Sequence, residues 1–247
     1  MKTKFIFYLF ITVLWLNLYS FKFILIEPNE SEINSFHVMT TAVTQALFEE
    51  VMSYNNSYHQ GEMHPITNVS WYEAIIFCNK LSEKHILQPV YKLNGNNDVN
   101  SWGALPAHRL LTWTNIEADP EADGYRLLTN KEWDYLYRQI INNQDFSLEE
   151  VAFVFSNSEN TTHPVAQKRS DILGLYDFLG NVKEWYYEDR GIISPQHYES
   201  LSPEKIAFYE SLSYRKFRRN DYITVKNRYG LYPVTKNSQI GFRIAKS

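Results

Sequence analysis

Two acidic side chains beside a Gly-Asn pair have the spacing of ligands for a hard cation. Asp177, Gly180, Val182 and Glu184 place two carboxylates and two backbone carbonyls within eight residues. A tight turn at the Gly-Asn pair brings these oxygens toward one point, and such oxygen ligands suit Ca²⁺. We therefore predict a structural calcium site at these four residues. The alternative is that Asp177 caps a turn and Glu184 pairs with a nearby Lys or Arg.

The single cysteine, Cys78, restricts the thiol chemistry of the chain. One cysteine forms no internal disulfide and no Cys-based zinc cluster. Cys78 falls at helical spacing with the apolar residues Trp71, Ala74, Ile75 and Leu81, so we expect a small buried hydrophobe rather than a nucleophile.

Motifs of other catalytic classes are missing from the sequence. It contains no Gly-x-Ser-x-Gly elbow, no phosphate-binding Gly-rich loop and no His-Glu-x-x-His pair. The adjacent acids Glu49/Glu50 and Glu149/Glu150 would point in different directions on a helix. We expect them to lie on solvated faces.

The C-terminal part of the chain is basic and aromatic. Residues 211–247 contain nine Lys or Arg and one acid, Asp221. Such a surface suits an anionic ligand, a glycan or a protein. The predicted ligand contacts are Tyr214, Arg215, Phe217 and Arg219. The alternative is that these cations face acidic residues of the same domain. Nucleic acid is not expected, because the N-terminus indicates export.

The elements that must position these residues form a mixed pattern. Short apolar stretches at 21–26, 36–39 and 90–93 predict strands, and apolar residues at helical spacing predict a helix from about Thr44. Two capping boxes, Ser70 with Glu73 and Thr129 with Glu132, mark the starts of two main helices. Residues 97–124 have little periodicity and are expected to form a surface excursion. The pattern favours one α+β domain with small sheets and much irregular loop.

The N-terminus resembles a targeting segment. Lys2 and Lys4 precede an apolar run from Phe5 to Leu16, and Ser20 is a small residue at a possible cleavage point. We therefore expect residues 1–20 to be a signal peptide or an N-terminal anchor and residues 21–247 to form the domain, outside the cytoplasm. The alternatives are a buried helix and strand, or an uncleaved anchor that provides the only contact with a membrane.

Four segments in order resemble the sulfatase-modifying-factor family, which includes the formylglycine-generating enzymes. The first is Pro-Ile-Thr-Asn-Val-Ser-Trp-Tyr-Glu-Ala at 65–74, continued by Phe-Cys-Asn-Lys-Leu-Ser at 77–82. The second is Tyr-Arg-Leu-Leu-Thr-Asn-Lys-Glu-Trp at 125–133. The third is His-Pro-Val at 163–165 with Gly-Leu-Tyr-Asp-Phe-Leu-Gly-Asn-Val-Lys-Glu-Trp at 174–185, and the fourth is Ile-Gly-Phe-Arg-Ile at 240–244.

This resemblance implies a C-type-lectin-like fold with two main helices, small antiparallel sheets and long loops. It also implies a calcium site at Asp177, Gly180, Val182 and Glu184, and a binding cleft lined by the basic C-terminal region. Family members include copper-dependent oxidases and an iron-dependent sulfoxide synthase.

The sequence departs from the family where the oxidase chemistry would occur. Soft sulfur ligands hold Cu(I), and the family's cysteine pair corresponds to about residues 212–225 here. That stretch contains no cysteine and no Gly-Gly-Ser-Trp pattern. Copper is therefore not expected, and the scattered histidines give no support for iron. We predict an exported, non-catalytic binding module; the alternative is a divergent metal-dependent oxidoreductase with non-cysteine ligands.

Overall fold

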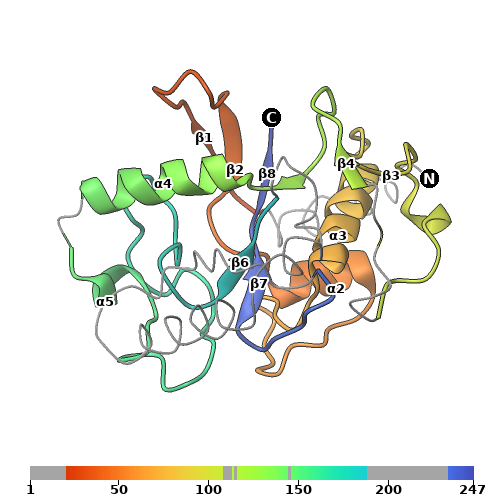
Figure 1. Ribbon diagram of the computed structural model, residues 1–247. Helices are drawn as coiled ribbons and strands as arrows, with labels where there is room; N and C mark the ends of the chain where they lie inside the picture. Colours follow the sequence, from red (N-terminus) through yellow and green to blue (C-terminus); the bar gives the residue numbers. More distant parts are fainter. Residues whose placement is uncertain (1–20, 108–112, 114–115, 144–145, 188–232) are drawn as a thin grey trace, which may run out of the picture.

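A four-stranded antiparallel sheet joins the two ends of the described chain. The computed structural model describes residues 21–107, 113, 116–143, 146–187 and 233–247. The sheet has the order β1 (Phe23–Ile26), β2 (Phe36–Met39), β8 (Ile244–Lys246) and β5 (Arg126–Leu127), with Val38 opposite Ala245 (Figure 1). The predicted targeting segment at 1–20 and the predicted ligand contacts at 214–219 lie outside the described residues.

The sheet separates two hydrophobic clusters. Ile244 belongs to the cluster that contains α2 (Gln45–Met52) and α3 (Trp71–Lys84), whereas Ala245 belongs to the cluster of α4 (Asn130–Asn142) and α5 (Leu148–Val151). Successive strand residues point to opposite faces, so a strand buried on both faces supplies both clusters. Both residues are fully buried. Figure 1 shows α4 and α3 on opposite sides of β8.

The predicted helix starts are confirmed. The Ser70 hydroxyl accepts a hydrogen bond from the Glu73 N–H, and the Glu73 carboxylate accepts one from the Ser70 N–H. Thr129 and Glu132 form the same reciprocal pair at the start of α4. Each box satisfies backbone groups that a helix start would otherwise leave without partners. Thr44 caps α2 by accepting from the Leu47 N–H.

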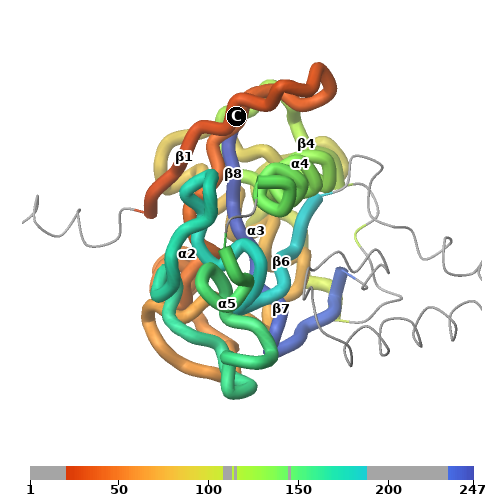
Figure 2. Tube along the Cα trace, turned by 90° about the vertical axis from the view of Figure 1, so that its left-hand side faces the viewer, coloured from red at the N-terminus to blue at the C-terminus, as the bar shows by residue number. Residues whose placement is uncertain are grey.

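Two small sheets accompany the central one. Strands β3 (Tyr91–Leu93) and β4 (Ile116–Ala118) are antiparallel, and η1 (Val99–Ser101) lies between them in sequence. Strands β6 (Lys183–Trp185) and β7 (Ile240–Phe242) are parallel and lie side by side in both views (Figures 1 and 2).

Two details of the predicted fold are corrected by these sheets. The 97–124 excursion contains η1 and β4, and the β6–β7 pair is parallel rather than antiparallel. Strands β4, β6 and β7 have three residues each, too few for a periodic sequence signal.

The two adjacent acid pairs lie at solvent-exposed positions, as expected: Glu49, Glu50, Glu149 and Glu150 are exposed. Within the described part of the chain, no helix has the length and apolar character needed to cross a membrane.

Ile86, just after α3, has an unfavourable backbone conformation. Its φ is +60°, and its side chain is 95% exposed. A left-handed conformation costs an L-residue about 1–2 kcal/mol, and asparagine tolerates it better than a β-branched residue. We expect Ile86→Asn to raise the free energy of unfolding by about 1 kcal/mol. Urea denaturation measures this change.

Ile172 provides the matched control. It is also an exposed isoleucine, at 59%, but it is not among the residues with positive φ. Ile172→Asn should change stability by no more than about 0.5 kcal/mol. Equal effects of the two substitutions would show that backbone strain at Ile86 is negligible.

Candidate functional site

Cys78 lies inside the domain, as its spacing predicts. Its side chain is fully buried in α3, and burial raises the pKa of the thiol well above its usual range. A thiolate, the form that attacks substrates and binds soft metals, is therefore strongly disfavoured. Because the sequence has no other cysteine, the chain lacks the reactive thiols of the formylglycine-generating chemistry.

Trp71, the first residue of α3, holds both flanks of the segment 188–232. Its backbone N–H donates to the Pro233 carbonyl at 3.0 Å, and its indole N–H donates to the Tyr186 carbonyl at 3.0 Å. The Asn68 N–H also donates to the Asn237 carbonyl at 2.9 Å. Trp71 therefore contacts the described residues on both sides of the segment that carries the predicted ligand contacts.

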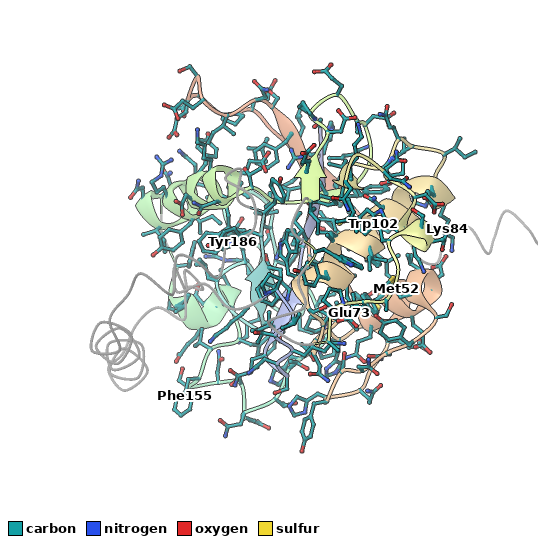
Figure 3. The ribbon with its side chains drawn as sticks, turned by 45° about the vertical axis from the view of Figure 1, so that its right-hand side comes forward. Met52, Glu73, Lys84, Trp102, Phe155 and Tyr186 are labelled. Carbon is teal, nitrogen blue, oxygen red and sulfur yellow. The ribbon has the colours of Figure 1, made fainter. Side chains whose placement is uncertain are left out.

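The Glu73 carboxylate also stabilises this junction through four hydrogen bonds. One carboxylate oxygen accepts from the Ser70 N–H and hydroxyl, and the other accepts from the Tyr54 hydroxyl and the Lys236 ammonium, each at 2.7 Å. Burial alone would raise the pKa of Glu73, but the hydrogen bonds from Lys236, Ser70 and Tyr54 outweigh it and the pKa is lowered. Glu73 is thus an ionised anchor at the centre of the fold (Figure 3).

A row of aromatic rings extends from the junction. Consecutive centroids are separated by 5.1 to 6.2 Å. In order, the row contains Trp102, Trp113, Tyr72, Trp71, Tyr187 and Tyr91. Pairs at these separations add favourable contacts beyond simple area burial. The row thus packs against the junction through Trp71 and Tyr187, and Trp113 is its partly exposed member.

Arg243 occupies the interior between β7 and β8. Its Nε and Nη2 donate to one oxygen of Glu184 at 3.2 and 3.1 Å. Its other donors reach three backbone carbonyls, those of Met39, Thr40 and Tyr176. The side chain is fully buried, so this guanidinium satisfies groups from β2, the 171–178 loop and β6 at once. It joins segments that are distant in the sequence.

The four predicted calcium ligands lie together in the turn that precedes and enters β6. Asp177 has a φ of +54° and its Oδ2 accepts from the Ala166 N–H at 2.8 Å. The Gly180 carbonyl accepts from the Val182 N–H at 2.8 Å. A Cβ on Gly180 would lie 2.3 Å from the Phe153 carbonyl oxygen, so only glycine fits this turn. Glu184 pairs with Arg243, which is the alternative considered for this carboxylate.

Two buried oxygens at this turn have no hydrogen-bond partner. They are Asp177 Oδ1 and Glu184 Oε2. Burial raises the pKa of both carboxyls and outweighs the effect of Arg243. Such orphaned acceptors suit a hard cation, which would satisfy both. Among the described residues, no cluster of three His, Cys, Asp or Glu side chains could hold a metal ion, so a cation here would depend on backbone carbonyls for further ligands.

A third buried acid, Asp171, gives the stability a pH dependence. Burial raises its pKa to about 6, although its Oδ1 accepts from the Leu173 and Leu175 N–H groups. A carboxyl whose pKa is higher in the folded state than the ordinary 3.8 stabilises the fold below pH 3.8 and loses this contribution as the pH rises through about 6.

Asp171→Asn should therefore remove part of the pH dependence. The amide oxygen can keep the two backbone hydrogen bonds, and no charge is buried. Between pH 4.5 and pH 7.5, the free energy of unfolding of the variant should fall by about 1–2 kcal/mol less than that of the wild type, as measured by urea titrations. Asp119→Asn is the comparison, because hydrogen bonding by Lys92 lowers the pKa of Asp119, so this group titrates below the measured pH range and the variant should follow the wild-type profile. Parallel profiles for wild type and Asp171→Asn would contradict the prediction.

The fold and these motifs define a protein of the sulfatase-modifying-factor class. The model of the "Sulfatase-modifying factor enzyme 1-like domain" matches residues 26–247, and the chain belongs to this family. The family expected from the four sequence segments is thus confirmed.

Relatives extend this result. The chaperone protein LppX of Paenibacillus barcinonensis is 31% identical over an alignment of 187 residues, and the match covers 63% of this chain and 63% of the relative. This chain thus covers less than two thirds of that relative. Treponema denticola variable protein 1 has a TM-score of 0.63, 24% identity and coverage of 92% and 93%. The structure of CarF has a TM-score of 0.56, 24% identity and coverage of 91% and 93%. These two structural similarities show the α+β fold.

The sequence alone does not predict the roles of some residues of the site. Trp71 and Glu73 are recognisable as the start of a capped helix, but nothing local shows that they hold Pro233 and Lys236. Arg243 is part of the C-terminal motif, and the signal for its role is an arginine within an apolar strand sequence. Asp171 carries no signal in the sequence that would have identified it.

Proposed function

We propose that this chain is a non-catalytic binding protein that holds another polypeptide against its basic C-terminal segment. The observation that carries the proposal is the Trp71 junction, where hydrogen bonds fix both flanks of the segment 188–232. Because the residues on both sides of the segment are already hydrogen-bonded to Trp71, binding need not order this part of the domain.

The composition of this segment indicates the class of partner. Arg215, Arg218 and Arg219 alternate with aromatic residues, so an acidic polypeptide with exposed apolar groups would be complementary to it. The relative LppX is called a chaperone protein, which supports a polypeptide over a glycan or a small anion. Tyr214, Arg215, Phe217 and Arg219 are the proposed contacts.

Binding to a defined unfolded polypeptide tests the proposal. Reduced and carboxymethylated α-lactalbumin is an acidic, unfolded probe, and dextran sulfate is a purely anionic one. We expect the polypeptide to bind, and the double variant Arg215→Ser/Arg219→Ser to bind it at least about tenfold more weakly. Lys131→Ser/Arg138→Ser is the matched control, since it also removes two cations but on α4, where they pair with Glu32 and Glu30.

Three results would overturn the proposal. They are an absence of binding, an equal loss in the control, and binding of dextran sulfate alone. Copper or iron in the purified protein together with oxygen consumption on a thiol peptide would instead support the divergent oxidoreductase.

Under native conditions, Cys78 should resist a maleimide reagent and react only after denaturation, because it is fully buried.

We also propose Ca²⁺ as a structural ion at the turn before β6. Asp177 and Glu184 would supply carboxylate oxygens, and Gly180 and Val182 would supply carbonyls. The ion would neutralise buried charge and satisfy the two orphaned oxygens. At a Ca²⁺ concentration 100 times the Kd, stability should rise by about 2.7 kcal/mol. Calorimetry with and without a chelator measures this; an unchanged melting temperature and no heat of binding would exclude the ion.

A further inference from the structure

We propose that the face around the first described residues contacts the surface of a bilayer that contains anionic lipids. This N-terminal face consists of Phe21, Phe23, Leu25 and Ile86, together with the cations Lys84 and Lys246. Lys84 and Ile86 lie at the C-terminal end of α3, whereas Trp71 begins that helix, and the inference is independent of the polypeptide-binding function.

An aromatic cluster holds the first described residues against the end of α3. Phe21 stacks on His85 with centroids 5.8 Å apart, and it meets Tyr125 edge-on at 5.9 Å. Phe23 stacks on Tyr125 at 5.8 Å, and a His85 ring nitrogen lies 2.8 Å from the Tyr125 hydroxyl. Phe21, the first described residue, is thus held against the end of α3.

Apolar side chains project into solvent near this aromatic cluster. Leu25 follows Phe23 by two residues and so shares its face of β1, where it is 52% exposed. Ile86 is adjacent to His85 and is 95% exposed. Its positive φ costs folding energy, and its side chain buries almost nothing in return. Strain at an exposed apolar residue is expected where that residue serves a contact outside the domain.

The charges around these residues favour a negatively charged surface. Lys246 lies 5.8 Å from the centre of the Phe23 ring, and Lys84 precedes His85 and Ile86 directly. Lys84 also pairs with Glu50, and both side chains are more than two fifths exposed, so the pair is open to solvent. Lys84 is exposed and Lys246 is partly exposed, and lysines next to apolar side chains are the usual composition of a surface that rests on anionic headgroups.

The length of the preceding chain limits the distance to a membrane. The apolar run from Phe5 ends at Leu16, and four residues separate Leu16 from Phe21. However they are arranged, these five steps span at most about 18 Å. The headgroup layer of one leaflet occupies roughly 5–7 Å of that length. Insertion of residues 5–16 in the bilayer, which this inference requires, would keep Phe21 within about 18 Å of the end of the apolar run and so near the headgroups.

Site-specific fluorescence on the full chain tests this inference. Because Cys78 is buried, a thiol-reactive environment-sensitive dye labels a cysteine introduced at position 86 or 155. Phe155 is the matched control, as it is 75% exposed and lies far from Lys84 in Figure 3. The labelled chains are reconstituted into phosphatidylcholine–phosphatidylglycerol vesicles that carry a headgroup quencher.

We expect the dye of Ile86→Cys to be quenched at least threefold more than that of Phe155→Cys. In a second pair, with the dye at Leu25→Cys, adding Ile86→Asn should reduce quenching, whereas adding Phe155→Asn should not. Equal quenching at positions 86 and 155 overturns the inference. Self-quenching between dyes at position 86, unaffected by the lipid quencher, would show a second copy on this face and also overturns it. So does a membrane-isolated chain that begins after residue 20, since the tether is then absent.

Discussion

Arg243→Met is expected to remove about 3–5 kcal/mol of stability, the largest effect of any single substitution proposed for this protein. The guanidinium is fully buried and donates to Glu184 and to three backbone carbonyls. Methionine fills similar space but leaves Glu184 as an unpaired buried charge and the carbonyls without donors. Thermal unfolding should show a decrease in melting temperature of about 10 °C.

Companion variants separate charge from packing at this position. Adding Glu184→Gln to Arg243→Met should recover part of the loss, because it removes the uncompensated charge. Arg243→Lys should also be strongly destabilising, since one ammonium cannot replace the several directed donors of a guanidinium. Arg169→Met is the surface control: its pair with Glu150 is more than half exposed at both side chains and should contribute little. A loss below about 1 kcal/mol for Arg243→Met would contradict this account.

The second large effect is expected at Glu73. Glu73→Ala removes half of the capping box and leaves the Lys236 ammonium, the Tyr54 hydroxyl and the Ser70 N–H without their acceptor. We expect a loss of about 3 kcal/mol at neutral pH, as the sum of a lost cap and lost hydrogen bonds to a buried charge. Urea denaturation followed by tryptophan fluorescence measures it.

The pH dependence gives this prediction a second test. The pKa of Glu73 is lowered in the folded state, so its contribution is present above the ordinary value of 4.5 and is lost as the pH falls below it. The difference between wild type and Glu73→Ala should therefore shrink in acid. Glu83→Ala, at an exposed position of the same helix, should leave stability nearly unchanged. A wild-type-like Glu73→Ala would show that the junction is held by Trp71 alone.

Local patterns in the sequence determined most of the elements of this fold. The capping boxes at Ser70 and Thr129 depend on residues three positions apart, so a linear reading finds them. The place of Cys78 on a buried helix face follows from helical spacing in the same way. The four ordered motifs were sufficient to indicate the family, which the match over residues 26–247 confirms.

Only the tertiary structure decided which distant groups meet. Lys236 and Glu73 are 163 positions apart, and Arg243 and Glu184 are 59 apart. Nothing in the spacing of the residues predicts these pairs, because burial and the paths of several strands bring them together. The same holds for Ile86. Its sequence neighbours do not reveal that it has a positive φ after α3, nor that Phe21 stacks on the adjacent His85. Short-range hydrogen bonding thus sets the elements, while desolvated charges and long-range packing set the site.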